Sequence, residues 1–247
     1  MSSNASSTDR QPVGLLSDDV LATETDDFPV RFLVTGFGPF AGVQRNPTMD
    51  IVGSLSHYIK KQGYAMLSEA LVETTIIVTA ARVAQSWLND TCTRLRDQKN
   101  SSSTTVVMLH LGVNTGARHF QLESCAWNEA TFRVHDENGW KPTKEAIFEN
   151  LPVDACVKSS LDVYSLVEEL KGAKVVDVPI LVSRDPGRFV CNYTYCYSLG
   201  KCSDLEAEGV SIKSLFLHVP SFEVVEKETQ LALVVTLMEA IAKQVTA

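Results

Sequence analysis

The chain has 247 residues, 45% of them hydrophobic and 21% charged, a composition that suits one large α/β domain or two small ones. A formal net charge of −8 argues against nucleic acid and against an anionic membrane surface as partners. No apolar run approaches the roughly 20 residues that cross a bilayer, and no basic start followed by an apolar stretch marks a signal peptide. A cytoplasmic protein is therefore expected.

The six cysteines lack the paired spacing of a zinc site, and their order marks no disulfide framework. We expect reduced thiols, as in most cytoplasmic proteins. Residues 1–27 are rich in Ser, Thr and Asp, so a disordered tail is expected ahead of one folded domain over residues 28–247.

A glycine-rich loop at 36–42 follows the first predicted strand, at 31–35. The loop lacks the third glycine of a dinucleotide-binding fingerprint. Its phenylalanines, Phe37 and Phe40, either line an apolar pocket or plug the end of the sheet. Asn46 then predicts a helix N-cap, because a proline suited to the first helical position follows it.

The rest of the chain alternates between apolar runs and amphipathic segments. Strand-like segments are predicted at 66–79 (two runs), 106–111, 120–127, 175–182 and 214–219. Helices are predicted at 81–96, at 160–170 with Gly172 as the stop, and at 227–244. This alternation indicates a single three-layer α/β/α sandwich with a largely parallel, mixed sheet, whose reactive groups are expected at the carboxyl ends of the strands.

Cys191 stands where a strand is predicted to pass through a tight Asp-Pro-Gly turn into a helix. In the first turn of a helix, unpaired N–H groups and the positive end of the dipole favour thiolate over thiol. A buried, inert thiol is the alternative, because free cysteine is often a core residue. Only partners elsewhere in the chain decide between the two.

A thiol nucleophile needs a base, and His218 is the histidine best placed to supply one. It sits near the end of a predicted strand, whereas His110 lies inside a strand and is expected to be a hydrogen-bonded core residue. Glu123 and Arg133 are not singled out by residue type, since a surface carboxylate and a structural ion-pair partner are equally ordinary roles for them.

Four segments in this order resemble the pyroglutamyl peptidase I family, also called pyrrolidone carboxyl peptidases, which are cytosolic cysteine peptidases. They are 34–43 (Val-Thr-Gly-Phe-Gly-Pro-Phe-Ala-Gly-Val) with Asn-Pro-Thr at 46–48, Leu-Gly at 111–112 with Leu-Glu at 122–123, 187–193 (Gly-Arg-Phe-Val-Cys-Asn-Tyr), and 216–220 (Phe-Leu-His-Val-Pro). The resemblance extends from about residue 32 to the end of the chain.

This resemblance implies a Glu123–Cys191–His218 catalytic triad and no cofactor or metal. It implies substrate-binding roles for four further residues: Phe37, Phe40, Asn46 and Arg133. The expected activity is that of an exopeptidase, which hydrolyses N-terminal pyroglutamate (5-oxoproline) from peptides through a thioester acyl-enzyme.

Some residues depart from the family pattern, so functions other than this peptidase activity are also considered. Val113 stands where many members have Gln, and Pro186 stands before Gly187 where Ala is common. A catalytically silent member that binds pyroglutamyl peptides or a protein partner is therefore the second hypothesis. A nucleoside-phosphorylase-like enzyme is a third, on fold analogy alone, although no convincing phosphate site is visible.

Overall fold

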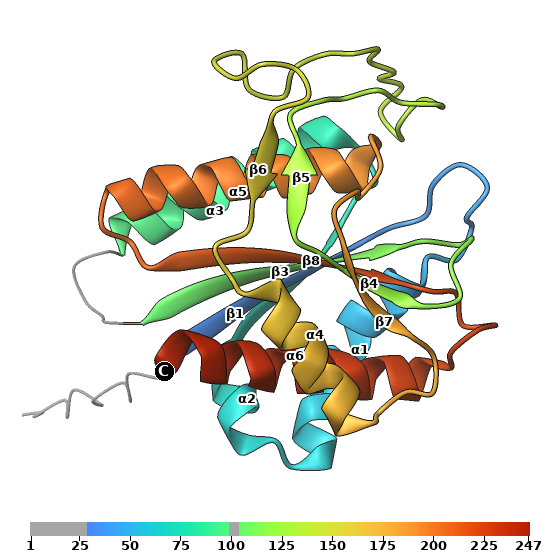
Figure 1. The fold of residues 1–247 in the computed structure, drawn as a ribbon, viewed down its shortest axis with the longest axis vertical. Coiled ribbons are helices and arrows are strands. Elements are labelled where there is room, and N and C mark those ends of the chain that lie inside the picture. Colours follow the sequence, from blue (N-terminus) through green and yellow to red (C-terminus); the bar gives the residue numbers. More distant parts are fainter. Residues whose placement is uncertain (1–28, 99–103) are drawn as a thin grey trace, which may run out of the picture.

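A computed structural model of the chain describes residues 29–98 and 104–247, so the tail predicted at 1–27 lies outside the described residues. At the centre is a six-stranded sheet in the order β2-β1-β3-β8-β4-β7 (Figure 1). Its strands are β1 (Val30–Phe37), β2 (Leu71–Ile77), β3 (Thr105–Val113), β4 (Phe120–Glu123), β7 (Ile180–Ser183) and β8 (Ile212–Val219). A separate antiparallel ribbon joins β5 (Cys125–Trp127) to β6 (Cys156–Lys158).

Helices cover both faces of the sheet, as Figure 1 shows: α3 and α5 lie on one face, and α1, α2, α4 and α6 on the other. They are α1 (Pro47–Gln62), α2 (Ala65–Ala70), α3 (Ala81–Asp97), α4 (Val163–Ala173), α5 (Val190–Ala207) and α6 (Lys227–Thr246). Among the described residues, none of these helices is both long and apolar enough to cross a bilayer. The predicted three-layer α/β/α sandwich is confirmed.

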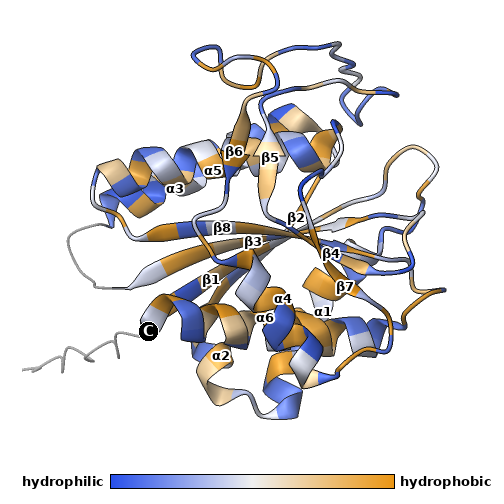
Figure 2. Ribbon diagram, viewed as in Figure 1, coloured by the Kyte–Doolittle hydropathy of each residue, from blue (hydrophilic) through white to orange (hydrophobic). Residues whose placement is uncertain are grey.

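The central strand β3 shows why the sheet needs two helical layers. Val107, Leu109 and Leu111 belong to the core shared with α1, α4 and α6, whereas Met108 points into the core beside α3 and α5. A strand buried on both faces is apolar along most of its length, and the polar residues it does contain must find hydrogen-bond partners. Figure 2 shows this concentration of apolar residues along the middle strands.

The loop after β1 is tied down by the predicted N-cap. The Asn46 Oδ1 atom accepts from the backbone N–H of Thr48 at 3.1 Å, and Pro47 is the first residue of α1. The Asn46 side-chain amide also donates to the carbonyl oxygen of Gly38 at 3.0 Å. One buried side chain therefore starts the helix and holds the glycine-rich loop in place.

Several predicted boundaries were wrong for local reasons. The first of the two runs predicted as strands at 66–79 is the helix α2, whose Ala-Met-Leu-Ser-Glu-Ala sequence consists mainly of good helix formers. The strand predicted at 175–182 shrinks to β7, a partly exposed edge strand. Gly172 lies inside α4, which is closed instead by Lys174 in the left-handed conformation.

Two strands of the sheet, β4 and β7, run in the opposite direction to the others, which the sequence did not indicate. The segment predicted as one strand at 120–127 divides at Ser124, which binds the carbonyl oxygen of Ser183, and only its first half joins the main sheet. That half, β4, runs antiparallel to β8, and β7 runs parallel to β4. The carboxyl end of β4 therefore lies beside the middle of β8, rather than at the edge where β1, β3 and β8 end, and β7 follows β4 on its other side.

Helix α1 packs so closely on β1 at Gly36 that any side chain there should destabilise the protein. A β-carbon there would lie 2.6 Å from the carbonyl oxygen of Thr48 and 2.9 Å from the Cγ2 atom of Val52. We expect Gly36→Ala to lower the free energy of unfolding by about 2 kcal/mol or more, because the helix backbone and the buried side chain cannot move away from the new methyl group without strain. Urea denaturation measures the change.

The matched control is Gly53→Ala on α1, where the nearest atom is the Cδ1 of Ile76 at 3.8 Å. That substitution should be neutral or stabilising by up to about 1 kcal/mol, because alanine favours a helix interior over glycine. Equal losses of stability in the two variants would contradict the close-packing argument.

Candidate active site

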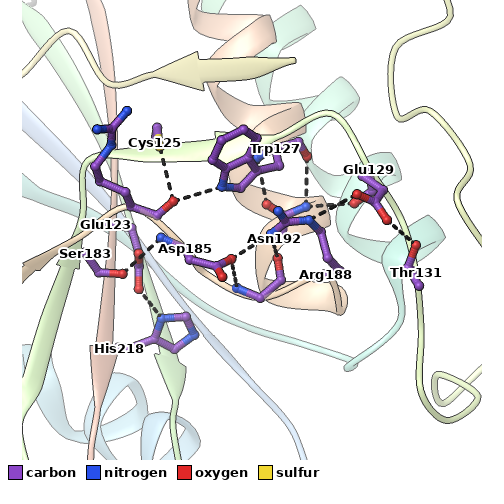
Figure 3. Close-up of polar contacts among 12 residues, drawn as sticks. Glu123, Cys125, Trp127, Glu129, Thr131, Ser183, Asp185, Arg188, Asn192 and His218 are labelled. Carbon is purple, nitrogen blue, oxygen red and sulfur yellow. Dashed lines mark hydrogen bonds and ion pairs between the residues drawn. The ribbon is translucent and has the colours of Figure 1, made fainter. Parts of the chain in front are cut away.

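His218 and Glu123 form a buried pair across two antiparallel strands. Glu123 lies opposite Phe216 in the register of β4 and β8, so its side chain emerges on the same face as His218, two residues further along β8. The His218 Nδ1 atom lies 2.8 Å from the Glu123 Oε1 atom (Figure 3). The side chains are 8% and 0% exposed, so water competes little for this bond.

The charge on His218 depends on these neighbours. Burial alone lowers its pKa, but hydrogen bonds and charge attraction from Cys191 and Glu123 outweigh burial and raise the pKa to about 9. Since Glu123 occupies Nδ1, the other ring nitrogen is left for the Cys191 thiol. The imidazole is thus held as a cation between two acidic groups near neutral pH.

Cys191 reaches this pair from the first turn of α5, as the sequence predicts. Gly187, at φ 80°, makes the tight turn before the helix, and Phe189 is an N-cap without a capping side chain. The Sγ atom lies against β3 at Gly112, where a β-carbon would come within 3.0 Å of it. The absence of a side chain at Gly112 is what lets the thiol approach the sheet.

The structure therefore brings Glu123, His218 and Cys191 together from β4, β8 and α5. Tyr195, one turn after the cysteine and fully buried, donates its hydroxyl to the main-chain oxygen of Glu123 at 2.8 Å. Within the described part of the chain, the second carboxylate oxygen of Glu123 has no hydrogen-bond partner. A nucleophile, a base and an orienting carboxylate in this order is the arrangement that activates a thiol.

His110 has the core role expected from its place in a strand. Its ring nitrogens lie 2.7 Å from the Thr35 hydroxyl and 2.9 Å from the Ser198 hydroxyl, and it is fully buried. Burial lowers its pKa to about 3, so it remains neutral. His110 thus takes no part in the site, although it packs against the same Phe216 ring as His218.

The two loop phenylalanines occupy different environments. Phe37 ends β1, is 2% exposed and packs on Phe216 with ring centroids 6.4 Å apart, so it closes the end of the sheet. Phe40 is half-buried and lies 6.2 Å from the ring of Phe189, next to the cysteine helix. The Phe189 ring in turn meets Phe132 at 4.8 Å.

Phe40, Phe189 and Phe132 thus form a continuous apolar wall from three separate segments. Phe132 itself is buried, and the sequence predicted neither contact, because it marks Phe189 as a helix-spaced core residue and Phe132 not at all. Arg133, next to Phe132, lies in the irregular segment expected there and has an exposed side chain. Asn46 is buried behind the loop at Gly38. The substrate-binding roles of Phe37, Phe40, Asn46 and Arg133 stay predictions.

The cysteines are free thiols, as predicted from their spacing. Within residues 29–98 and 104–247, no group of three or more His, Cys, Asp or Glu side chains is arranged to hold a metal ion.

Comparison with known proteins gives one consistent result. The model of the family described as pyroglutamyl peptidase matches residues 30–247. The chain is 28% identical over 191 residues to the pyrrolidone-carboxylate peptidase of Thermococcus kodakarensis, covering 77% of this chain and 81% of that one. It is also 28% identical over 188 residues to the enzyme of the same name from Escherichia fergusonii, with 76% and 77% covered.

Solved structures agree on the fold. A variant of pyrrolidone carboxyl peptidase from Pyrococcus furiosus superposes with a TM-score of 0.70 at 24% identity, covering 87% of this chain and 100% of that one. The enzyme of that name from Fervidobacterium islandicum superposes with a TM-score of 0.67 at 23% identity, covering 87% and 99%.

The thiols should differ sharply in reactivity. Burial raises the pKa of Cys92 and of Cys125 to about 11 and that of Cys196 to about 12, so these thiols hold their protons at neutral pH. We expect iodoacetamide near pH 7.5 to alkylate Cys191 at least about tenfold faster, because only the thiolate reacts. Site-resolved mass spectrometry measures the rates. Uniform labelling of these four cysteines would contradict the site geometry.

The raised pKa of His218 also makes stability depend on pH. The folded protein keeps this proton up to about pH 9, whereas an unperturbed histidine releases it near 6.5, so the contribution is full below pH 6.5 and lost as the pH rises through about 9. Between about pH 6 and pH 10, the free energy of unfolding should fall by up to about 3 kcal/mol more in the wild type than in His218→Gln. Urea denaturation at both pH values measures this, and parallel pH profiles would refute it.

Proposed function

The chain belongs to the pyroglutamyl peptidase family, and we propose that it is a cysteine-type exopeptidase that removes N-terminal pyroglutamate from peptides. The observation that carries the proposal is His218, held between the Cys191 thiol and the Glu123 carboxylate in a buried site. The names of the relatives supply the substrate class, and the site supplies the means to act on it.

The substrate requires an unusual amino-terminal pocket. Pyroglutamate is a five-membered lactam, so a peptide that begins with it has no α-ammonium group for a carboxylate to bind. A flat ring is best held by an apolar surface with a few backbone hydrogen bonds for the lactam N–H and C=O. The wall of Phe40, Phe189 and Phe132 supports this role, with Phe37 behind it at the end of β1.

Acylation begins when the Cys191 thiolate attacks the carbonyl carbon that links the ring to the next residue. A C–S bond forms, and the carbonyl electron pair moves onto oxygen. Free backbone N–H groups at the start of α5 stabilise that oxyanion, and Arg133 adds positive charge in this proposal. His218 then gives its proton to the leaving nitrogen as the C–N bond breaks, which leaves a thioester.

In deacylation the same residues act again, but His218 accepts a proton instead of donating one. The now neutral His218 takes a proton from water, the resulting hydroxide attacks the thioester carbonyl, and the C–S bond breaks to release pyroglutamate and the thiolate. Glu123 keeps the ring oriented and stabilises the cation in each cycle. Asn46 contributes by holding the loop that carries Phe40, through its bond to Gly38.

The proposed setting is the cytoplasm, where the site thiol stays reduced. The proposed substrates are peptides with a blocked amino terminus, and neither nucleic acid nor a membrane is part of the proposal.

The test is hydrolysis of a pyroglutamyl-arylamide reporter by the wild type, Cys191→Ala and the matched control Cys92→Ala. Cys92 is buried on α3, away from α5's first turn. We expect Cys191→Ala to lose at least about 1,000-fold in kcat/KM, because the covalent step has no other nucleophile. Cys92→Ala should stay within about threefold of the wild type.

Equal hydrolysis by the wild type and Cys191→Ala would remove this cysteine from the mechanism. A wild type that binds a pyroglutamyl peptide but does not hydrolyse the reporter would instead support the silent binding protein.

A further inference from the structure

Asn192, the residue after the nucleophile, is fully buried yet takes no part in the chemistry proposed above. Its side chain leaves α5 and binds the backbone at the end of β5 and in the segment that follows it. The Oδ1 atom accepts from the N–H of Trp127 at 2.8 Å, and the amide nitrogen donates to the carbonyl oxygens of Trp127 at 2.9 Å and Glu129 at 2.8 Å. Figure 3 shows these bonds crossing from the helix to the strand.

These bonds use the amide oxygen as an acceptor and the amide nitrogen as a donor. A peptide N–H and a peptide C=O of the same residue, Trp127, are paired as in a β-ladder, although the partner is a side chain on a helix. An aspartate has no donor for the two carbonyl oxygens, and an alanine has neither group. The site therefore requires an asparagine, because no other side chain of this length provides both an acceptor and two donors.

The segment that Asn192 holds leads to the apolar wall. Three residues after Glu129 comes Phe132, which packs on Phe189, and Arg133 follows it. We propose that Asn192 is a positioning residue, which fixes the distance between the Cys191 thiol and the wall that receives the substrate ring. This inference rests on the proposed function, because it assigns the coupling between the nucleophile and the substrate site of that same reaction.

A second set of contacts supports the same junction from the turn before α5. The Arg188 guanidinium lies 5.1 Å from the ring centroid of Trp127 and binds Glu129 at 3.3 Å and Asp185 at 2.6 Å. The indole N–H of Trp127 donates to the carbonyl oxygen of Arg184 at 2.8 Å. The residues on both sides of the cysteine thus bind the same short segment.

Asn128 offers a matched control because it is also fully buried and also uses both ends of its amide. Its nitrogen donates to the carbonyl oxygens of Phe148, Leu151 and Pro152, and its oxygen accepts from the N–H groups of Ile147 and Phe148. All five bonds remain within the loop and none reaches α5. Asn128 lies in the same segment, between Trp127 and Glu129, so replacing it removes a comparable structural amide while the three bonds from Asn192 to that segment stay in place.

The experiment compares Asn192→Ala, Asn192→Asp and Asn128→Ala with the wild type in two measurements. The first is reporter kinetics, with kcat and KM separated. The second is the pH profile of Cys191 alkylation by iodoacetamide, read by mass spectrometry, which needs no substrate. Thermal unfolding checks that each variant is folded. The aspartate side chain has nearly the same shape as asparagine, so Asn192→Asp tests the proposal if Asn192→Ala does not fold.

We expect both Asn192 variants to lose about 100-fold in kcat/KM, because a shift of about 1 Å in a reacting group has that effect. Both kcat and KM should change, and Cys191 should be alkylated more slowly near neutral pH, because the start of α5 is then held less firmly beside His218. Asn128→Ala should lose stability but keep kcat/KM within about threefold and leave the alkylation profile unchanged.

Asn192 variants that match Asn128→Ala in kinetics and in alkylation would overturn the positioning role while leaving the peptidase proposal intact. A wild type without reporter activity would refute the proposed function instead, and the alkylation profiles would still decide whether Asn192 positions Cys191.

Discussion

The antiparallel placement of β4 beside β8 is the constraint on which the site depends. A carboxylate at the end of a parallel neighbour would lie at the edge of the sheet where β8 ends, rather than beside the middle of that strand. Reversing β4 places Glu123 opposite Phe216, beside the middle of β8 and within 2.8 Å of the His218 ring. A buried carboxylate is tolerated only when a partner compensates for the water it has lost, and His218 is that partner.

The Cys191 thiol approaches this pair from another element, a helix that is itself part of the core. Helix α5 is buried along most of its length, so its position is set by packing against the sheet and α3 rather than by the exposed turn before it. Its first turn meets β3 at Gly112, where any side chain would strike the Phe216 ring and the thiol. The core thus determines where the sulfur lies, and the helix start provides its electrostatic environment.

The remaining contacts make this arrangement stiff. Tyr195 holds the backbone of Glu123 from α5, and Asn192 holds the segment after β5 from the same helix. Asn46 and Thr79 both bind the carbonyl oxygen of Gly38 behind the first loop. Each bond joins two elements that meet at the site, so side chains on separate loops and strands keep a common geometry, which the proposed catalysis would require.

Much of the fold, and the position of Cys191 in it, followed from local patterns in the sequence. The strand and helix periodicities predicted the three layers, the Asn-Pro pair predicted the start of α1, and Asp-Pro-Gly before residues that recur at helical spacing placed Cys191 in a helical first turn. The motifs that resemble the family named Glu123, which nothing in its own surroundings distinguished from an ordinary surface carboxylate. Boundaries failed where short segments of good helix formers or an edge strand allowed more than one local structure, as at α2 and β7.

What the sequence determined by itself is the class of the fold and the place of Cys191 in the first turn of a helix, because periodicity, caps and turns are local properties of the chain. Only the tertiary structure decided that β4 and β7 reverse direction, that Phe132 and Phe189 extend the wall begun by Phe40, and that Asn192 binds the segment leading to it. These relations join residues far apart in the chain. They are selected by burial and hydrogen-bond geometry, which no short window of sequence contains.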